Sequence, residues 1–565
     1  MSSLDWLVLL GTLGFIVIYG VWKTRGAKNI DTYLLGDKSM KWWTIGLSVM
    51  ATQASAITFL STPGQAFESG MGFVQFYFGL PIAMVILCIT VIPIYYRLKV
   101  YTAYEYLESR FDLKTRTLAS VLFMVQRGLA AGITIYAPAI ILSSILGWSL
   151  TYTNIFIGVL VIVYTVSGGT KAVSQTQKQQ MAVIMGGMVV AFVILVNLLP
   201  DDITFGEAVK VAGKMGKLEV VDFTFNPYER YNFWAGITGG LFLALSYFGT
   251  DQSQVARYLG GKSITESRLG LLFNGLLKIP MQFFILFIGV MVFVFYQFNQ
   301  PPVFFNEVAK SKLYESPYKE ELQDLEQQHA AIFEEKQAEV RGLVAAINSE
   351  SEEAIAVQQD KIAAIDEKAT EVRSRVIALI KDHTPDAETK DTDYVFIRFV
   401  MDYLPKGIVG LLLAVIFSAA MSSTSSELNA LASTATVDIY KRSIRKKESD
   451  KHYVVASKWF TVLWGGLAIS FATLASLVDN LIEAVNILGS VFYGTILGIF
   501  LVAFYFKYIK SRAVFIAAII AELVVILLYF YSDIGYLWFN VIGCFLVIVL
   551  GFLFQRFMVV EEPTV

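Results

Sequence analysis

Long apolar segments separated by short polar loops recur along almost the whole chain. Each has about the length that a helix needs to cross a membrane. The thirteen candidates are 4–22, 41–67, 72–97, 117–145, 151–167, 179–199, 230–255, 269–298, 407–438, 454–475, 481–506, 512–532 and 535–556. Several are longer than one crossing requires, so we expect tilted or broken helices among them. The pattern predicts an all-α polytopic membrane protein with thirteen transmembrane helices.

Residues 301–393 interrupt this pattern, because they hold 11 basic and 21 acidic side chains. Their second half has a heptad repeat, typical of a coiled coil. Its two seam positions are Ile355, Ile362, Ala369, Val376 and Gln358, Ile365, Val372, Leu379. Ser349 and Glu352 fit a helix-capping box before it. We expect a helical hairpin insertion, which divides the membrane domain into 1–300 and 394–565. It is either a solvated spacer packed on itself or a surface for self-association or partner contact.

The loops differ in charge in a way that predicts orientation. Lys and Arg gather in every second loop, and cytoplasmic loops carry such an excess. These residues are Lys23, Arg25, Lys28, Lys38, Lys41, Arg97, Lys99, Arg110, Lys114, Arg116, Lys171, Lys178, Arg257, Lys262, Arg268, Lys441, Arg442, Arg445, Lys446, Lys447, Lys507, Lys510 and Arg512. The alternation predicts an extracellular N-terminus and hairpin and a cytoplasmic C-terminus. The membrane would be the plasma membrane, or the inner membrane of a Gram-negative cell.

Composition excludes several classes of function. Hydrophobic residues make up 55% of the 565 residues and charged residues 16%, with a mean hydropathy of +0.58. The net charge of −2 comes without a clustered basic face, so no nucleic-acid partner is expected. Cys88 and Cys544 lie in apolar runs and indicate no disulfide framework. No catalytic constellation is visible, so we expect a protein that is not an enzyme. The long apolar spans indicate that it contacts membrane lipid.

Two stretches within predicted spans are rich in hydroxyl groups. The first, Ala51 to Gly64, ends in Pro-Gly. Irregular backbone at membrane depth is tolerated where it lines a cavity, and transporters use broken helices to bind ions; a Pro-kinked packing helix is the alternative. The second, Ala419 to Asn429, has Ser422 one turn before Ser426 and Ser423 one turn before Glu427. Hydroxyls opposite freed carbonyls suit a small cation, although small residues also allow close helix packing.

Ionisable side chains within spans are functional hypotheses by default. Asp251 follows Gly249, which is a candidate helix break in the span 230–255. Four other residues share this status, although any of them can lie nearer an interface: Arg127, Lys278, Glu427 and Glu483.

At these residues the chain resembles the sodium/solute symporter family. The resemblance extends through the membrane part and includes Asp31–Ser39, Trp42-Trp43, Thr102–Phe111, Tyr136–Ala139, Tyr164–Gly169, Asp251-Gln252, Arg257-Tyr258, Leu404–Leu411, Ser422–Asn429 and Asp438–Tyr440. It implies a LeuT-type fold with inverted five-helix repeats, one span before them and two after. It also implies a sodium-coupled symporter that imports a small organic solute by alternating access.

The resemblance implies two cation sites. Sodium would bind backbone oxygens of Ala51, Ala54 and Ala419 and hydroxyls of Ser422 and Ser423. A second candidate cation site comprises Ser425, Ser426, Glu427 and Gln177. Where some members have Trp-Thr-Asp, this chain has Gln175-Thr176-Gln177, so an amide replaces a carboxylate. Glu427 would restore the lost charge, pair with Lys178, or lie at the surface.

The resemblance also bears on the solute. Sugar-transporting members carry Glu-Gln where this chain has Ile57 and Thr58, so a hexose is disfavoured. Ser55 and Thr58 resemble the sialic-acid, monocarboxylate, vitamin and iodide transporting members, so we expect an anion or carboxylate. Arg127 would hold a carboxylate bidentately, line the exit, or pair with an acid. The substrate candidates are Gln53, Ser55, Thr58, Phe73, Gln75, Tyr77, Arg127, Asp251 and Gln252. The alternatives are a sensor or scaffold that uses the hairpin, and a symporter of a neutral sugar, polyol or amino acid.

Overall fold

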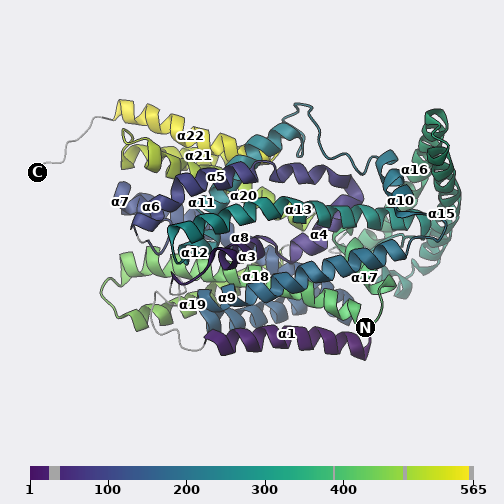
Figure 1. Ribbon diagram of the computed structural model, residues 1–565, viewed down its shortest axis with the longest axis horizontal. Helices are drawn as coiled ribbons and strands as arrows, with labels where there is room; N and C mark the ends of the chain where they lie inside the picture. Colours follow the sequence, from purple (N-terminus) through teal and green to yellow (C-terminus); the bar gives the residue numbers. More distant parts are fainter. Residues whose placement is uncertain (25–37, 99, 386–388, 475–479, 559–565) are drawn as a thin grey trace, which may run out of the picture.

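Membrane-length helices form a bundle with nearly parallel axes, and two long helices, α15 and α16, lie across one end of it (Figure 1). This computed structural model describes residues 1–24, 38–98, 100–385, 389–474 and 480–558, with the backbone alone at 17, 20–24 and 167–175. The charged first loop and the Asp31–Ser39 motif lie almost entirely outside these residues. We call the end with α15 and α16 the hairpin end.

The bundle consists of these elements: α1 (Ser3–Thr24), α3 (Trp42–Gln53), α4 (Ala56–Ser69), η2 (Gly70–Tyr77), α5 (Leu80–Ile89), α6 (Val91–Leu98), α8 (Leu113–Leu146), α9 (Leu150–Asn197), η3 (Ala235–Gly239), α11 (Gly240–Gly249), α12 (Gln252–Leu259), α13 (Ile264–Phe298), α18 (Ile408–Thr434), η6 (Ala435–Ile444), α19 (Asp450–Ala472), α20 (Leu481–Tyr505), α21 (Ser511–Tyr531) and α22 (Leu537–Phe557). The connecting elements are α7 (Glu105–Arg110), α10 (Phe205–Lys214), α14 (Glu307–Ser311), η4 (Lys312–Glu315), α15 (Lys319–Asn348), α16 (Glu352–His383), η5 (Thr392–Tyr394) and α17 (Val395–Tyr403).

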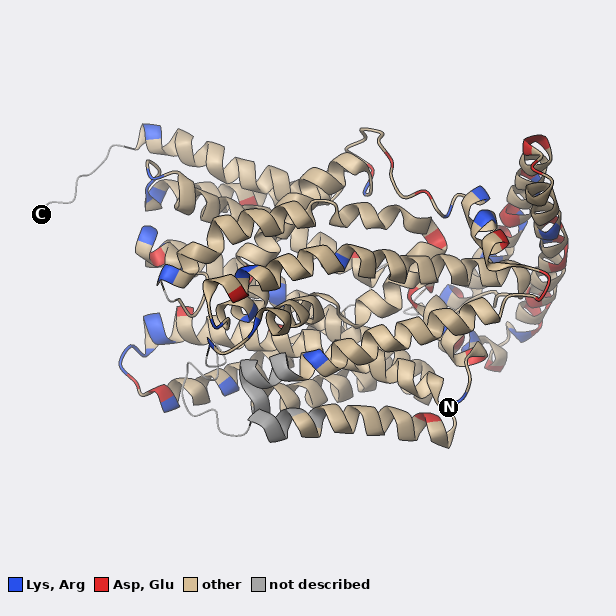
Figure 2. Ribbon diagram, in the orientation of Figure 1, with Lys and Arg blue, Asp and Glu red and all other residues tan. Residues whose placement is uncertain are grey.

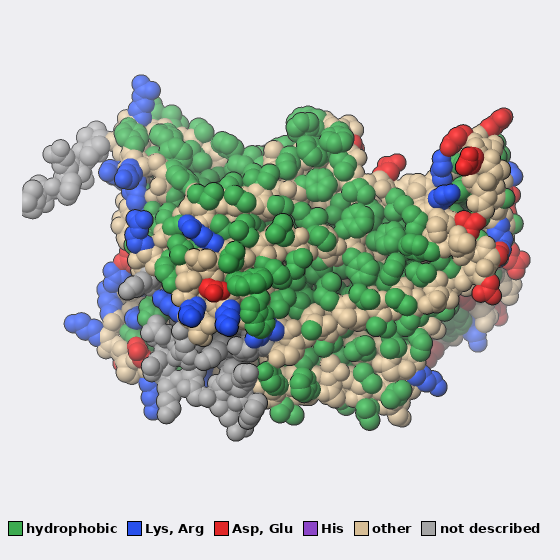
Figure 3. Space-filling view, viewed as in Figure 1, with side chains coloured by type: hydrophobic (Ala, Val, Ile, Leu, Met, Phe, Trp, Pro, Cys, Tyr) green, Lys and Arg blue, Asp and Glu red, His purple; other side chains and the backbone are tan. Residues whose placement is uncertain are grey.

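Apolar side chains form a belt around the bundle. Figure 3 shows them over most of one face between two charged ends. Among the described residues, 9 helices are long and apolar enough to cross a membrane, and three shorter apolar helices accompany them. No strand forms within the described ranges, where one isolated bridge joins Met40 to Gly261. The predicted all-α polytopic class is confirmed, and the number thirteen stays a prediction.

Helix α9 contains two passes through the bundle. The hydroxyls of Tyr164 and Thr176 lie 2.5 Å apart. In a straight α-helix these positions would be separated by about 18 Å along the axis. The helix therefore doubles back between them, as the two apolar segments 151–167 and 179–199 require.

Two passes are broken, as the sequence suggested. The segment 41–67 forms α3 and α4, with the interruption at Ala54 and Ser55. The segment 230–255 forms α11 and α12, with the interruption at Thr250 and Asp251. Pro63 and Gly64 lie inside α4, so the helix breaks two turns earlier than the Pro-Gly pair.

The hairpin is an antiparallel pair that buries its apolar seam within itself. Five of the predicted seam residues of α16 are buried, namely Ile355, Ile362, Ile365, Val372 and Val376, and so is Ile380, next to the seam position Leu379. Ion pairs such as Lys336–Asp366 (2.6 Å) and Lys361–Glu339 (3.1 Å) flank the seam. The capping prediction was wrong by two residues, because Ser351 caps α16 by accepting from the Ala354 amide.

The hairpin is also fixed to the bundle. Its tip contacts α10 and the preceding loop: Arg341 pairs with Asp202, and Asn348 donates to Glu207 (2.6 Å). Nearer its base, the Gln337 amide donates to the Phe298 carbonyl at the end of α13 (2.6 Å). These contacts hold the hairpin against the bundle along much of its length.

The hairpin should lose stability in acid because of His329 on α15. Burial, together with the cations Arg373, Lys336 and Lys310, lowers the pKa of His329 to about 4, and the acid Glu326 opposes this only in part. Between pH 6.5 and 4 the unfolded hairpin therefore binds a proton that the folded hairpin does not, and stability falls as pH falls. We expect the opening free energy of α15, measured by hydrogen exchange, to fall by up to about 3 kcal/mol from pH 7 to pH 4. In His329→Gln most of this dependence should vanish; an unchanged pH profile would contradict the assignment.

Candidate functional site

The break between α3 and α4 leaves two backbone carbonyls without their helical partners. The Ser55 amide, which would bond to the Ala51 carbonyl in a continuous helix, donates to the Gln53 carbonyl (3.1 Å). The Thr58 amide likewise donates to the Ser55 carbonyl (3.0 Å) and not to that of Ala54. Both freed carbonyls belong to buried residues. In a membrane such groups need a partner from the protein, water or an ion.

Hydroxyls of α18 face this break. Ser422 donates to the freed Ala51 carbonyl (3.2 Å), and Ser423 donates to the Ala419 carbonyl (3.0 Å). Ala54 ends α3 one turn beyond Ala51. The structure thus brings together two of the neutral, hard oxygen atoms expected to bind sodium, the Ala51 carbonyl and the Ser422 hydroxyl. This donor set fits a small monovalent cation.

The amide of Gln177 lies within the second candidate cation site. Its Nε2 donates to the hydroxyls of Thr52 (3.1 Å) and Ser426 (3.0 Å), and its Oε1 accepts from Ser48. The Ser425 hydroxyl bonds to the Ser422 carbonyl (3.1 Å). The side chain of Gln177 therefore links α3, α9 and α18 with hydrogen bonds, and its N–H groups point where a cation would need oxygen atoms.

Glu427 lies apart from this amide, in a buried ionic cluster around Arg127. Arg127 Nη1 donates to Glu427 (3.0 Å), and Nη2 donates to Asp251 and to the Tyr493 hydroxyl. Tyr493 also donates to Asp251 (2.9 Å). Glu427 is thus neither at the surface nor paired with Lys178, whose ammonium lies over the Trp43 ring at 4.8 Å. One arginine faces two carboxylates, so the cluster carries one net negative charge when all are ionised.

A small cavity of about 80 Å³ adjoins this cluster. Five of the nine substrate candidates line it: Gln53, Ser55, Thr58, Tyr77 and Arg127. The remaining wall comes from Ile57, Phe76, Leu243, Tyr247, Ile482, Val485, Asn486, Gly489 and Tyr493. The cavity lies beside the break in α3/α4, which brings the candidate sodium and solute sites together.

The other four candidates have different surroundings. Asp251 contacts the cavity wall through Arg127 and Tyr493, and its second oxygen accepts from the Ser253 amide and hydroxyl. Gln252 is bonded to the backbone of Ala103 and Tyr101. Gln75 bonds to the Tyr231 carbonyl and the Asp222 amide, and Phe73 packs on Tyr231 at 5.1 Å between ring centroids. All four residues lie outside the set that lines the cavity.

Sequence reasoning missed the contribution of α20. Asn486 and Tyr493 are seven residues apart and therefore lie on the same face of that helix. Two polar groups at this spacing within an apolar span were a usable signal. Nothing in the sequence, however, indicated that Tyr493 contacts Arg127 and Asp251.

Comparison with known proteins decides the family. The model of the sodium:solute symporter family matches residues 33–310 and 375–521. The chain belongs to this family. Its members are transporters, so the expectation that the chain is not an enzyme is confirmed. The match omits residues 311–374, which make up most of the hairpin.

Individual sodium:solute symporters resemble the chain over most of its length. It is 28% identical to sodium-coupled monocarboxylate transporter 1 of Mus musculus over 88% of this chain and 68% of that protein. It is 26% identical to the Xenopus laevis protein of the same name, of whose length it spans 66%. The sodium/sialic acid symporter SiaT of Proteus mirabilis is 26% identical, with 97% of this chain and 94% of that protein covered.

A solved structure confirms the fold. An outward-open structure of a Na+-coupled sialic acid symporter matches with a TM-score of 0.76 and 23% identity over 100% of both chains. The chain therefore has the LeuT-like fold that the resemblance implied.

Replacing Gln177 by Asp should create a second cation site. The change removes the N–H donors, adds a charge, and leaves the hydroxyl oxygens of Thr52 and Ser426 free for a cation. We expect the Hill coefficient for sodium, measured by sodium-dependent stabilisation of purified protein, to rise from about 1 toward 2. Gln180→Asp, an equally buried change one turn along α9, is the control and should add no cation. An unchanged coefficient in Gln177→Asp would contradict this view of the site.

Proposed function

We propose that this chain is a sodium-coupled symporter that imports a small organic solute by alternating access. A short carboxylate is the first candidate for this solute. The observation on which the proposal depends is the freed Ala51 carbonyl, which accepts from Ser422 and lies one turn before a second freed carbonyl at Ala54. Sodium bound there would brace the broken pass against α18 and complete the adjacent cavity. Each ligand would then raise the affinity for the other, because such coupling is reciprocal.

The charge of the neighbouring cluster supports a bound cation. Arg127 balances one of its two carboxylates, and the excess negative charge lies near Glu427. Ser423 is one helical turn before Glu427 on α18. A sodium ion at the hydroxyls would therefore neutralise the region without a further protein charge. Because Gln177 fills the second candidate site with N–H donors, we propose one sodium per cycle.

The names of the relatives and the size of the cavity support a short carboxylate. The relatives transport monocarboxylates or sialic acid according to their names. A cavity of about 80 Å³ suits a solute of few non-hydrogen atoms, since a cavity of about 150 Å³ accommodates benzene. Gln53, Ser55, Thr58 and Asn486 would supply hydrogen bonds to its oxygen atoms.

A neutral polar solute is the second candidate, and the pairing of Arg127 favours it. Both terminal nitrogens of its guanidinium already donate to carboxylates. A solute carboxylate would have to displace Asp251 or Glu427 from Arg127, or bind through the hydroxyl and amide groups alone. A neutral amino compound, sugar or polyol would need no such exchange.

The proposed orientation puts the N-terminus and the hairpin outside and the C-terminus in the cytoplasm. In Figure 2, Lys and Arg gather at the end opposite the hairpin, as cytoplasmic ends require.

The proposed division into 1–300, 301–393 and 394–565 agrees with the omission of 311–374 from the family match. The buried seam of the hairpin favours self-packing over a surface for self-association. The apolar belt would contact the lipid of the plasma membrane.

Ser423→Ala should weaken sodium binding. The change removes one ligand and leaves the helix intact, so the sodium concentration for half-maximal uptake into proteoliposomes should rise at least about tenfold, a loss of roughly 1.4 kcal/mol. Ser433→Ala is the matched control, because that buried hydroxyl on α18 also bonds to its own helix (2.9 Å). Equal sodium dependence in both variants would refute the proposed site.

The membrane potential should distinguish the two kinds of solute. One sodium with a monocarboxylate moves no net charge, whereas one sodium with a neutral solute moves one positive charge inward. We expect uptake of a short monocarboxylate such as pyruvate to be unaffected by an inside-negative potassium–valinomycin potential. Potential-driven uptake of a neutral sugar or amino acid, without uptake of carboxylates, would instead establish the second candidate.

A further inference from the structure

A short turn at residues 391–394, here called the closing turn, lies where α4 ends and α20 begins. Its Thr392 hydroxyl donates to Glu68 at the end of α4 (2.9 Å). Its Asp393 carboxylate accepts from the Leu481 amide at the start of α20 (3.3 Å). The turn also touches Gly64 so closely that an added Cβ would lie 2.0 Å from the Thr392 carbonyl oxygen. The closing turn therefore bridges α4 and α20.

These two helices are walls of the cavity. Ile57 and Thr58 of α4 and Ile482, Val485 and Asn486 of α20 line it. The closing turn contacts α4 about two to three turns beyond Thr58, and it contacts α20 at Leu481, directly before Ile482. A solute that entered from the hairpin end between α4 and α20 would have to displace the closing turn.

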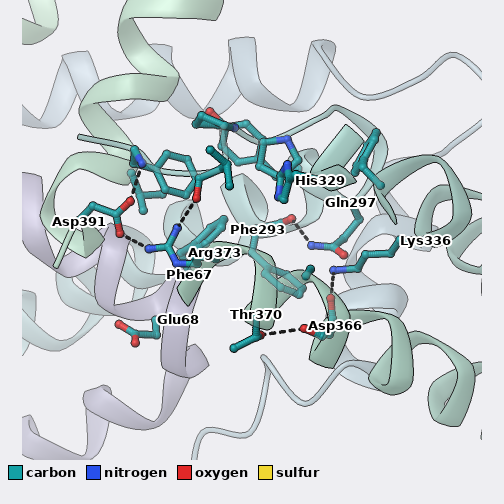
Figure 4. Close-up of a pocket in the computed structure, with 18 of the residues that line it drawn as sticks. Phe67, Glu68, Phe293, Gln297, His329, Lys336, Asp366, Thr370, Arg373 and Asp391 are labelled. Atoms are coloured by element: carbon teal, nitrogen blue, oxygen red, sulfur yellow. Dashed lines mark hydrogen bonds and ion pairs between the residues drawn. The ribbon is translucent and has the colours of Figure 1, made fainter. Parts of the chain in front are cut away.

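The hairpin holds the closing turn through one ion pair. Arg373 of α16 donates to Asp391, whose other oxygen accepts from the Phe305 amide. The guanidinium also donates to the Val303 carbonyl (3.1 Å). Figure 4 shows Arg373 and Asp391 on the wall of a second cavity of about 330 Å³, between the hairpin and the ends of α4 and α13. Asp391 is 1% exposed, so loss of Arg373 would leave a buried carboxylate without its cation.

The hairpin is a suitable anchor for this contact. It is fixed to α10 by Arg341 and Asn348, and its two helices are bound to each other by the buried seam. Arg373 lies within the segment that the family model omits, whereas Asp391 lies within the matched part. The ion pair thus joins an element outside the family match to the transport core.

We infer that the hairpin acts as a latch on the outer closure of the transport path, with Arg373 as its positioning residue. The inference rests on the proposed function for the direction of transport. Breaking the Arg373–Asp391 pair frees the closing turn from the hairpin and raises the fraction of molecules that are open at the hairpin end. Restoring a cation at this position restores the closure.

The test measures access to the cavity from the hairpin end. Val485→Cys places a thiol on the cavity wall, and a membrane-impermeant methanethiosulfonate reagent is added to the hairpin side of oriented proteoliposomes. The native Cys88 and Cys544 are buried, and the protein without Val485→Cys gives the background. We expect Arg373→Gln to raise the labelling rate at least about tenfold and Arg373→Lys to restore much of the slow rate. Arg375→Gln, which removes an exposed arginine of the same helix, should leave the rate unchanged.

A second variant tests the closing turn without altering the hairpin. Gly64→Ala forces the Thr392 carbonyl away from α4, so it should also raise the labelling rate. Fast labelling in Gly64→Ala with slow labelling in folded Arg373→Gln would overturn the latch, as would slow labelling in both. Hydrogen exchange of α15 verifies that the hairpin is folded in each variant.

Sodium-dependent uptake by the protein that retains Arg373, Gly64 and Val485 separates this inference from the proposed function. Intact uptake by that protein with slow labelling in the variants would remove the latch alone. Fast labelling in the variants, with no sodium-dependent uptake by that protein, would remove the proposed function alone.

Discussion

The arrangement of the core depends on one constraint, which is that backbone polar groups within a membrane must find partners inside the protein. The interruption at Ala54 and Ser55 leaves two carbonyls that their own helix does not satisfy. A neighbour with hydroxyl groups at close range can satisfy such a carbonyl, and Ser422 of α18 donates to that of Ala51. The same need accounts for the small side chains along α18, because larger ones would hold the two helices apart.

The ionic cluster at Arg127 follows from a related constraint. A buried arginine is stable only with close counter-charges, and breaking one such pair leaves an expensive uncompensated charge. Arg127 on α8 meets Asp251 at the second broken pass and Glu427 on α18. The cluster therefore connects the broken pass α11/α12 with the hydroxyl-rich helix α18. The connection runs through α8, which is itself unbroken. Displacement of any one of these helices changes the environment of all three charges.

Local patterns in the sequence were sufficient to predict much of this fold. Apolar length indicated the passes, the hydroxyl-rich stretch indicated the first break, and the heptad indicated the α15–α16 pair. The partners of Glu427 and Arg127 were beyond reach, because they lie 300 positions apart and meet only through helix packing. Gln75 and Gln252 were inferred as solute contacts from polarity alone, yet each is bonded to backbone groups of distant loops. Polarity within a span identifies a side chain that needs a partner, but it does not identify the partner.

On the proposed stoichiometry of one sodium per cycle, the amide of Gln177 would set a thermodynamic ceiling on what the transporter can accumulate. With one sodium per cycle, a tenfold sodium gradient and a potential of about 100 mV, a neutral solute reaches a concentration ratio of about 500. A monoanion reaches a ratio of only about 10 under the same conditions, because its charge cancels the contribution of the potential. A second sodium would multiply either ratio by the same factor of about 500. The Gln177 side chain holds three helices together with hydrogen bonds where a second cation would bind. On the proposed stoichiometry, the transporter would therefore use fewer sodium ions per solute molecule and reach a lower solute concentration ratio.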